Sequence, residues 1–88
     1  MGELTQLPNI AGKLENQLID VGISTVEELK KVGSREAWLR ILERDPSACL
    51  MRLSALEGAI QGVRWHYLDE DTKRSLKEFY DKHKRTTR

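Results

Sequence analysis

Hydrophobic residues along this chain recur at the three-to-four-residue spacing of amphipathic helices. In the first such segment Ile10, Leu14, Leu18 and Val21 fall on one helical face. The polar residues Glu15, Asn16 and Asp20 occupy the other face. Alternation of apolar and polar residues, which is typical of half-buried strands, is absent from the sequence. The pattern therefore predicts an all-α chain whose first helix covers residues 10–21.

Glycine and hydroxyl residues separate the helical segments. Gly22 suits the left-handed position that ends a helix, and Thr25 with Glu28 forms a capping-box pattern for the next one. Gly33 and Ser34 repeat this arrangement, with the Ser34 hydroxyl expected as the cap of a third helix. The helices predicted from these signals cover residues 26–32 and 35–43.

The second half of the chain predicts one long core helix and one terminal helix. Asp45 is expected as the N-cap of the long helix and Pro46 as its first residue. Gly62 ends that helix, and Asp69 begins the last helix after a connector. The apolar face of the long helix, residues 46–61, consists of Cys49, Leu50, Leu53, Leu56 and Ile60.

The N-terminal third resembles a helix-hairpin-helix unit, which typically contacts the nucleic-acid backbone or another protein. In DNA-binding hairpins, glycines let backbone amides approach a phosphate at a helix N-terminus, but Asn9 and Ala11 stand at the corresponding positions here. Asn9, Ala11 and Lys13 are therefore the candidate DNA-backbone contacts. The alternative is a helix-packing corner with Ile10 in the core.

These signals together predict a compact five-helix, all-α domain that begins with a helix-hairpin-helix-like, or SAM-like, unit. We expect residues 1–6 to form a lead, residues 7–81 the domain, and residues 82–88 a basic, frayed tail. With 88 residues, the chain has room for one core.

Cysteine content and hydropathy point to a cytoplasmic protein. The single cysteine, Cys49, has no partner for an internal disulfide, which suits a reducing compartment. No segment approaches the roughly 20 apolar residues that a membrane span needs, and the N-terminus does not have the pattern of a secretion signal.

Charge is distributed unevenly along the chain. Residues 1–72 contain 8 Lys/Arg and 12 Asp/Glu, whereas residues 73–88 contain 7 and 2. The body is therefore acidic and the C-terminus basic, and the tail either contacts phosphates or is simply solvated.

Two tryptophans are the largest apolar groups, and they differ in context. Trp38 lies at helical spacing from Ile41 and Leu42, which predicts a core position. Trp65 stands in the connector between Arg64 and His66, and these three residues form the candidate interaction patch.

No catalytic or metal-binding pattern emerges from the sequence. His66 and His83 are too far apart for a ligand pair, and Cys49 on an apolar helix face predicts buried packing. Glu57, inside an apolar run, is expected as a buried partner of Arg52 or Arg64. We therefore expect no enzymatic activity, cofactor, metal or small-molecule substrate.

Several longer motifs carry a resemblance to a known family. They are Leu7-Pro8-Asn9-Ile10, Gln17-Leu18, Val21-Gly22-Ile23, Glu27-Glu28-Leu29-Lys30, the stretch from Gly33 to Ile41, Asp45-Pro46-Ser47-Ala48-Cys49 and the stretch from Leu56 to His66. Together they resemble the C-terminal domain of the TfoX/Sxy family of competence regulators. The resemblance implies an all-helical domain in a bacterial protein that regulates DNA-uptake genes. We expect contact with a protein partner or self-association, with DNA binding as the alternative.

Overall fold

The computed structural model of the chain describes residues 3–86, and its side chains for residues 3–83. This part contains five α-helices and two 3-10 helices and no strand, which confirms the all-α, five-helix prediction. The elements are η1 (Glu3–Gln6), α1 (Gly12–Asp20), α2 (Val26–Val32), α3 (Ser34–Arg44), α4 (Leu50–Gln61), η2 (Trp65–Tyr67) and α5 (Glu70–Thr86).

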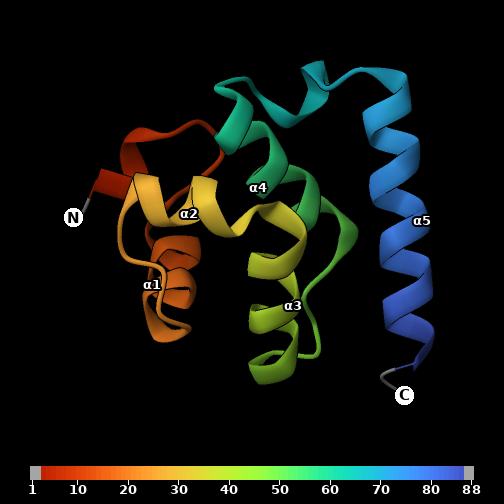
Figure 1. The fold of residues 1–88 in the computed structure, drawn as a ribbon, viewed down its shortest axis with the longest axis horizontal. Coiled ribbons are helices and arrows are strands. Elements are labelled where there is room, and N and C mark those ends of the chain that lie inside the picture. The colour runs from red at the N-terminus through yellow and green to blue at the C-terminus, as the bar shows by residue number, and fades with distance from the viewer. Residues whose placement is uncertain (1–2, 87–88) are drawn as a thin grey trace.

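Helix α4 is the central element of the fold. It contacts α3, η2 and α5, while α1 and α2 lie on the side of the molecule opposite α5 (Figure 1). Because neighbours surround it, α4 is buried around much of its circumference, as a core helix should be. The buried residues of α4 are Leu53, Ser54, Ala55, Leu56, Gly58 and Ala59.

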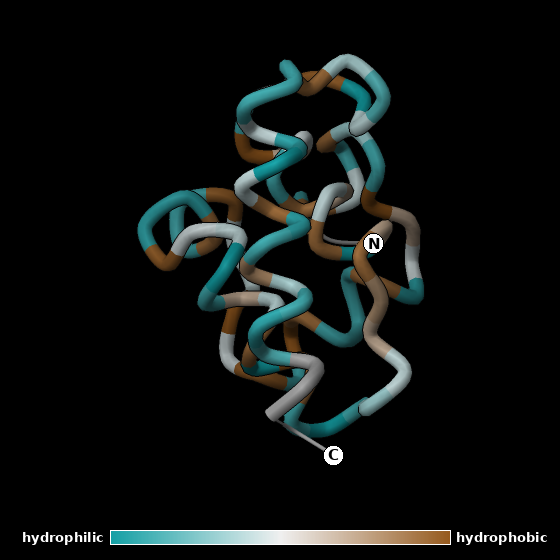
Figure 2. Tube along the Cα trace, turned by 90° about the vertical axis from the view of Figure 1, so that its right-hand side faces the viewer, coloured by the Kyte–Doolittle hydropathy of each residue, from teal (hydrophilic) through white to brown (hydrophobic). Residues whose placement is uncertain are grey.

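Trp38 joins three helices in the core, as its helical spacing predicts. Its side chain is fully buried, and its ring centroid lies 6.1 Å from that of Phe79 and 5.7 Å from that of Tyr80, both on α5. Its indole Nε1 donates a hydrogen bond of 3.2 Å to the Cys49 carbonyl at the start of α4. Figure 2, seen from the α5 side, shows that hydrophilic residues predominate along that helix.

The capping box predicted at Thr25 and Glu28 is confirmed. The Glu28 amide donates to Thr25 Oγ1 at 3.0 Å, and the Thr25 amide donates to Glu28 Oε1 at 3.2 Å. Hydrogen bonds from Ser24, together with that from Thr25, hold the pKa of the Glu28 carboxyl below its usual range. Gly22 and Gly62 end α1 and α4 with φ angles of 89° and 80°, which suit glycine.

Two predicted helix starts are wrong. Helix α1 begins at Gly12 rather than at residue 10, because Asn9 has a φ of 71° and Ala11 is extended. Helix α4 begins at Leu50 rather than at Pro46, because a turn precedes it, closed by a 3.0 Å bond from the Ala48 amide to the Asp45 carbonyl. Proline suits the second position of such a turn as well as the first position of a helix.

The later start of α4 also corrects the expectation for Cys49. Cys49 is the N-cap of α4 and has extended φ and ψ angles. Its side chain is exposed rather than buried on the apolar face. Ala48 takes the buried position instead.

Ser34 and Glu57 have roles other than those predicted. Gly33 is the N-cap of α3, and the Ser34 hydroxyl donates instead to Glu57 Oε1 at 2.6 Å. Glu57 also accepts a 2.6 Å bond from Gln61, so its partners are not Arg52 or Arg64. The pair Ser34–Glu57 ties the first turn of α3 to α4.

The two ends of the described chain differ from the simple pattern. Leu4 of η1, in the expected lead, is fully buried. Glu15, expected on the polar face of α1, is also buried, because both η1 and α3 pack on that short helix.

Helix α5 continues through Thr86 into the expected tail, whose last residues, 87 and 88, lie outside the described part. No helix within residues 3–86 is long and apolar enough to cross a membrane.

Candidate functional site

The side chain of Asn9 connects the N-terminal hairpin to the end of α4. Its Nδ2 donates to the carbonyls of Val63 and Ala55 at 3.0 and 3.4 Å, and its Oδ1 accepts a 3.2 Å bond from the Trp65 amide. Gly58 lies directly beneath, where a Cβ atom would approach Asn9 Nδ2 to 2.6 Å. The side-chain amide of Asn9 therefore fastens the N-terminal hairpin to α4 and to the connector that follows it.

The three candidate DNA-contact residues are placed differently from one another. Asn9 is half-buried and uses its side chain for internal hydrogen bonds, whereas Ala11 and Lys13 are exposed at the start of α1. The N-terminus of helix α1 has no side-chain cap, and its N-cap residue Ala11 and first residue Gly12 are exposed to solvent. Ile10 is buried in the core, as the helix-packing alternative expects.

The second candidate set, Arg64, Trp65 and His66, lies at the beginning of η2. Arg64 and His66 are exposed and Trp65 is half-buried. The Trp65 and His66 rings stack with centroids 4.2 Å apart and planes 22° apart. Because Asn9 holds the Trp65 amide, the two candidate sets adjoin each other.

An open groove of about 340 Å³ lies at this junction, between the start of α1, the first turns of α4 and η2. We call it the Trp65 groove. Met51, which is 57% exposed, and Trp65 are among its apolar lining residues. Its lining residues are Asn9, Leu14, Cys49, Met51, Arg52, Ala55, Arg64 and Trp65.

The Trp65 groove carries positive charge in the acidic part of the chain. Arg52 and Arg64 line it, and none of its lining residues is acidic. Arg52 Nη1 lies 3.0 Å from Oδ2 of Asp45, which does not line the groove, whereas Arg64 is exposed and has no ion-pair partner among residues 3–83. The groove can therefore accept an apolar group beside a carboxylate or another anion.

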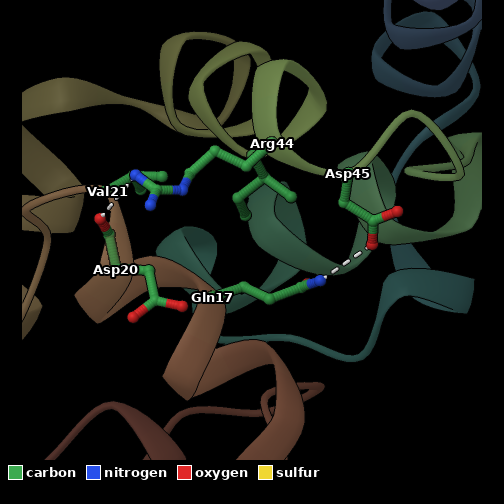
Figure 3. A pocket seen from close by; sticks show the side chains of 6 residues that line it. Gln17, Asp20, Val21, Arg44 and Asp45 are labelled. Atoms are coloured by element: carbon green, nitrogen blue, oxygen red, sulfur yellow. Dashed lines mark hydrogen bonds between the residues drawn. The ribbon is translucent and has the colours of Figure 1, made fainter.

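Asp45 pairs with Arg52 of the Trp65 groove and itself borders a second hollow, on the α1–α3 side. Gln17 of α1 donates to Asp45 Oδ2 at 2.9 Å, and Arg44 reaches the Asp20 carbonyl at the end of α1 at 3.4 Å (Figure 3). These contacts join α1 to the end of α3, so we assign this hollow a structural role.

The environment of Asp45 favours its charged form. Hydrogen bonds from the Ser47 hydroxyl and amide, followed by those from Arg52 and Gln17, hold the pKa of the Asp45 carboxyl well below its usual range. The carboxylate thereby fixes the direction of Arg52, one of the two cations of the Trp65 groove.

Sequence reasoning missed Met51 and the exposure of Cys49. Both lie in the first turn of α4, which was predicted to begin four residues earlier. The signal that identifies them is the Asp45-Pro46-Ser47 sequence read as a turn, in which Asp45 accepts a 3.0 Å bond from the Ser47 amide.

Comparison with known proteins places this fold in a family. The sequence pattern of the TfoX C-terminal domain matches residues 1–80. Protein Sxy of Escherichia coli (strain K12) is 35% identical over 78 residues, which are 89% of this chain but 37% of Sxy. This chain therefore spans little more than a third of the length of that relative.

Two crystal structures from Listeria monocytogenes have the same fold. An uncharacterized protein in a triclinic form is 57% identical with a TM-score of 0.89, and the match covers 90% of each chain. A protein of unknown function in a tetragonal form is 56% identical with a TM-score of 0.89, covering 91% of this chain and 98% of the other. The match over residues 1–80 and the identity to Sxy show that this chain belongs to the TfoX C-terminal domain family.

Proposed function

We propose that this chain is a non-enzymatic regulatory domain that acts in competence-related transcriptional regulation by contacting protein. The observation that carries the proposal is the Trp65 groove, whose lining includes Asn9 from the first candidate set and Arg64 and Trp65 from the second. Its exposed Met51 and half-buried Trp65 offer apolar contact, and Arg64 offers a cation at the edge. Aromatic residues, methionine and arginine are the residue types enriched in protein interfaces.

The chemistry of the groove favours binding over catalysis. Its lining contains one thiol and two guanidinium groups but no carboxylate or imidazole that would serve as a general acid or base. Cys49 stands at the N-cap of α4, and its backbone carbonyl accepts the bond from Trp38. These residues support a role in holding a partner.

Photo-crosslinking from within the groove tests the proposal. A photoreactive amino acid at Met51 of the full chain, expressed in its native host, is expected to capture a discrete protein that mass spectrometry identifies. The matched control places the same group at Lys31, an exposed position on α2. Equal capture of the same proteins from both positions would overturn the assignment of the groove.

A functional measurement accompanies the crosslink. Arg64→Glu reverses the exposed cation of the groove without removing a described internal contact, and we expect it to lower both the crosslinked product and the expression of a competence-gene reporter. Glu27→Lys, an exposed reversal on α2, should leave both unchanged. Reporter expression that is unaffected by Arg64→Glu, alongside a folded protein, would contradict the proposed role.

DNA binding is the second candidate function, and the open N-terminus of α1 favours it. Ala11 and Lys13 are exposed there without a side-chain cap, an arrangement that suits a phosphate. If DNA is the target, duplex binding should weaken steeply between about 50 and 200 mM salt, and Lys13→Glu should reduce it. If our first proposal is right, no duplex binds even at low salt, so neither the salt concentration nor Lys13→Glu has an effect on binding.

A further inference from the structure

Residues 64–71, next to the Trp65 groove, expose charges of opposite sign at their two ends. Arg64 stands at the beginning, and Asp69, Glu70 and Asp71 stand at the end. Between them Tyr67 is 78% exposed, the most exposed of the large hydrophobic side chains in the described part of the chain. The segment therefore combines an exposed cation, an aromatic anchor and carboxylates within eight residues.

The segment is held in one shape by contacts with the body. The Tyr67 amide donates to the Arg64 carbonyl at 2.9 Å, and Leu68, which follows Tyr67, is buried. Trp65 stacks on His66, and the Tyr67 ring centroid lies 6.3 Å from that of His66. A preorganised surface of this kind loses little conformational entropy on binding.

The helix that follows accounts for part of the acidic end. Asp69 Oδ1 accepts a 2.8 Å bond from the Thr72 amide as the cap of α5, and Asp71 pairs with Arg74 at 3.1 Å on an exposed surface. Glu70 and Arg64 have no ion-pair partner among residues 3–83. These two opposite charges lie near the two ends of the same segment and do not pair with each other.

A two-fold axis through the middle of this segment would pair its ends. In a symmetric dimer each surface patch meets its own copy, so a patch must be complementary to itself. When two copies of residues 64–71 lie antiparallel, Arg64 of each copy faces the carboxylates after Tyr67 in the other. Tyr67 of each copy then lies near the axis, beside the Trp65 groove of the other copy, and interfaces concentrate their affinity near their centre.

We propose that the occupant of the Trp65 groove is the Tyr67–Asp71 segment of a second copy of this chain, in a reciprocal two-fold dimer. Tyr67 packs against Met51 and Trp65 of the other copy, and Glu70 and Asp71 lie opposite its Arg64. The inference rests on the proposed function, since it names a second copy as the protein that the groove contacts. The interface is small, so we expect association in the micromolar range.

Charge reversal with exchange of partners tests the dimer in sedimentation velocity over a concentration series. Arg64→Glu places like charges at both ends of the interface, and so does the double variant Glu70→Lys with Asp71→Lys. Each variant alone is expected to raise the dimer dissociation constant about tenfold or more. Mixing the two variants restores opposite charges at both ends, so a heterodimer of near wild-type affinity should form.

Two further variants separate the interface from general effects. Tyr67→Ser is expected to weaken the dimer while leaving the circular dichroism and melting temperature close to those of the wild type. Lys31→Glu, an exposed reversal on α2, should leave the dissociation constant unchanged. Both measurements use the full chain.

Three results would overturn the inference. They are a wild-type chain that is monomeric throughout a series reaching several hundred micromolar, a mixture of the two reversed variants that stays monomeric, and a Tyr67→Ser variant that dimerises like the wild type. A monomeric chain that is nevertheless crosslinked from Met51 to another protein would overturn the dimer alone and leave the proposed function standing. Loss of that crosslink as well would remove both.

Discussion

At the residue scale, Asn9 shows how one side chain can replace a glycine and add a function of its own. Its φ of 71° is a left-handed conformation that asparagine tolerates better than other residues with a side chain. Its amide then satisfies two carbonyls and one backbone amide across the end of α4. The hairpin position therefore serves folding through an internal contact.

We expect Asn9→Ala to lower the free energy of unfolding by about 2–4 kcal/mol. The substitution leaves the Val63 carbonyl and Trp65 amide without their bonds and puts alanine at a positive φ. Asn9→Gly, which loses the bonds but not the backbone fit, should cost less, about 1–3 kcal/mol. Urea unfolding followed by circular dichroism measures both, and equal stability of Asn9→Ala and the wild type would contradict the role.

Gly58 offers a second prediction at this scale. An alanine Cβ there would stand 2.7 Å from the Val63 carbonyl oxygen as well as 2.6 Å from Asn9 Nδ2, so Gly58→Ala should destabilise the domain by about 1–3 kcal/mol. Gly12→Ala is the matched control, because no atom lies within 4 Å of its Cβ position and the helix gains from alanine. Thermal melts of the two variants should shift in opposite directions.

At the scale of elements, Asp45 fastens three parts of the fold together. It ends α3, accepts a bond from Gln17 of α1, and pairs with Arg52 of α4. The same carboxylate closes the turn through Ser47. A single charge therefore links α1, α3 and α4 and holds Arg52, which lines the Trp65 groove.

Stability should consequently fall at acid pH. The folded state holds the pKa of Asp45 below that of the unfolded chain, so its contribution is present above the unfolded value of about 3.9 and is lost as the pH falls below it. Asp45→Asn should lower stability at pH 7 and flatten its decline between about pH 5 and 3. Urea unfolding at several pH values measures this, with Glu43→Gln, an exposed carboxylate on α3, as control. An unchanged decline in Asp45→Asn would contradict it.

At the scale of the whole molecule, α5 closes the core from one side. Leu76 is fully buried, and Phe79 and Tyr80 contact Trp38, while the Arg35 guanidinium lies 5.9 Å from the Phe79 ring centroid. These contacts make the last helix part of the single core.

We expect Leu76→Ala to destabilise the entire domain by about 2–5 kcal/mol, because it opens a cavity at the α4–α5 contact. Lys77→Ala, one position along on the exposed face, should change stability by less than about 0.5 kcal/mol. Tryptophan fluorescence and far-ultraviolet circular dichroism should report the same unfolding midpoint. Separate midpoints would show that α5 unfolds independently.

The sequence by itself determined the local structure and the family motifs. The 3.6-residue period selected the helices and the core position of Trp38, and the capping box at Thr25 and the end of α4 at Gly62 follow from short-range chemistry. It misplaced the start of α4, because Asp45-Pro46 is compatible with both a turn and a helix cap.

Only the tertiary structure decided which residues share a surface. The Trp65 groove depends on Asn9 meeting Val63 and Trp65 across 54 and 56 positions of the chain, and on Met51 standing exposed beside them. Periodicity reports which face of a helix is apolar, but not which distant segment covers that face. That choice is made by packing in three dimensions, where a few long-range hydrogen bonds fix the hairpin against the end of α4 and so create the groove.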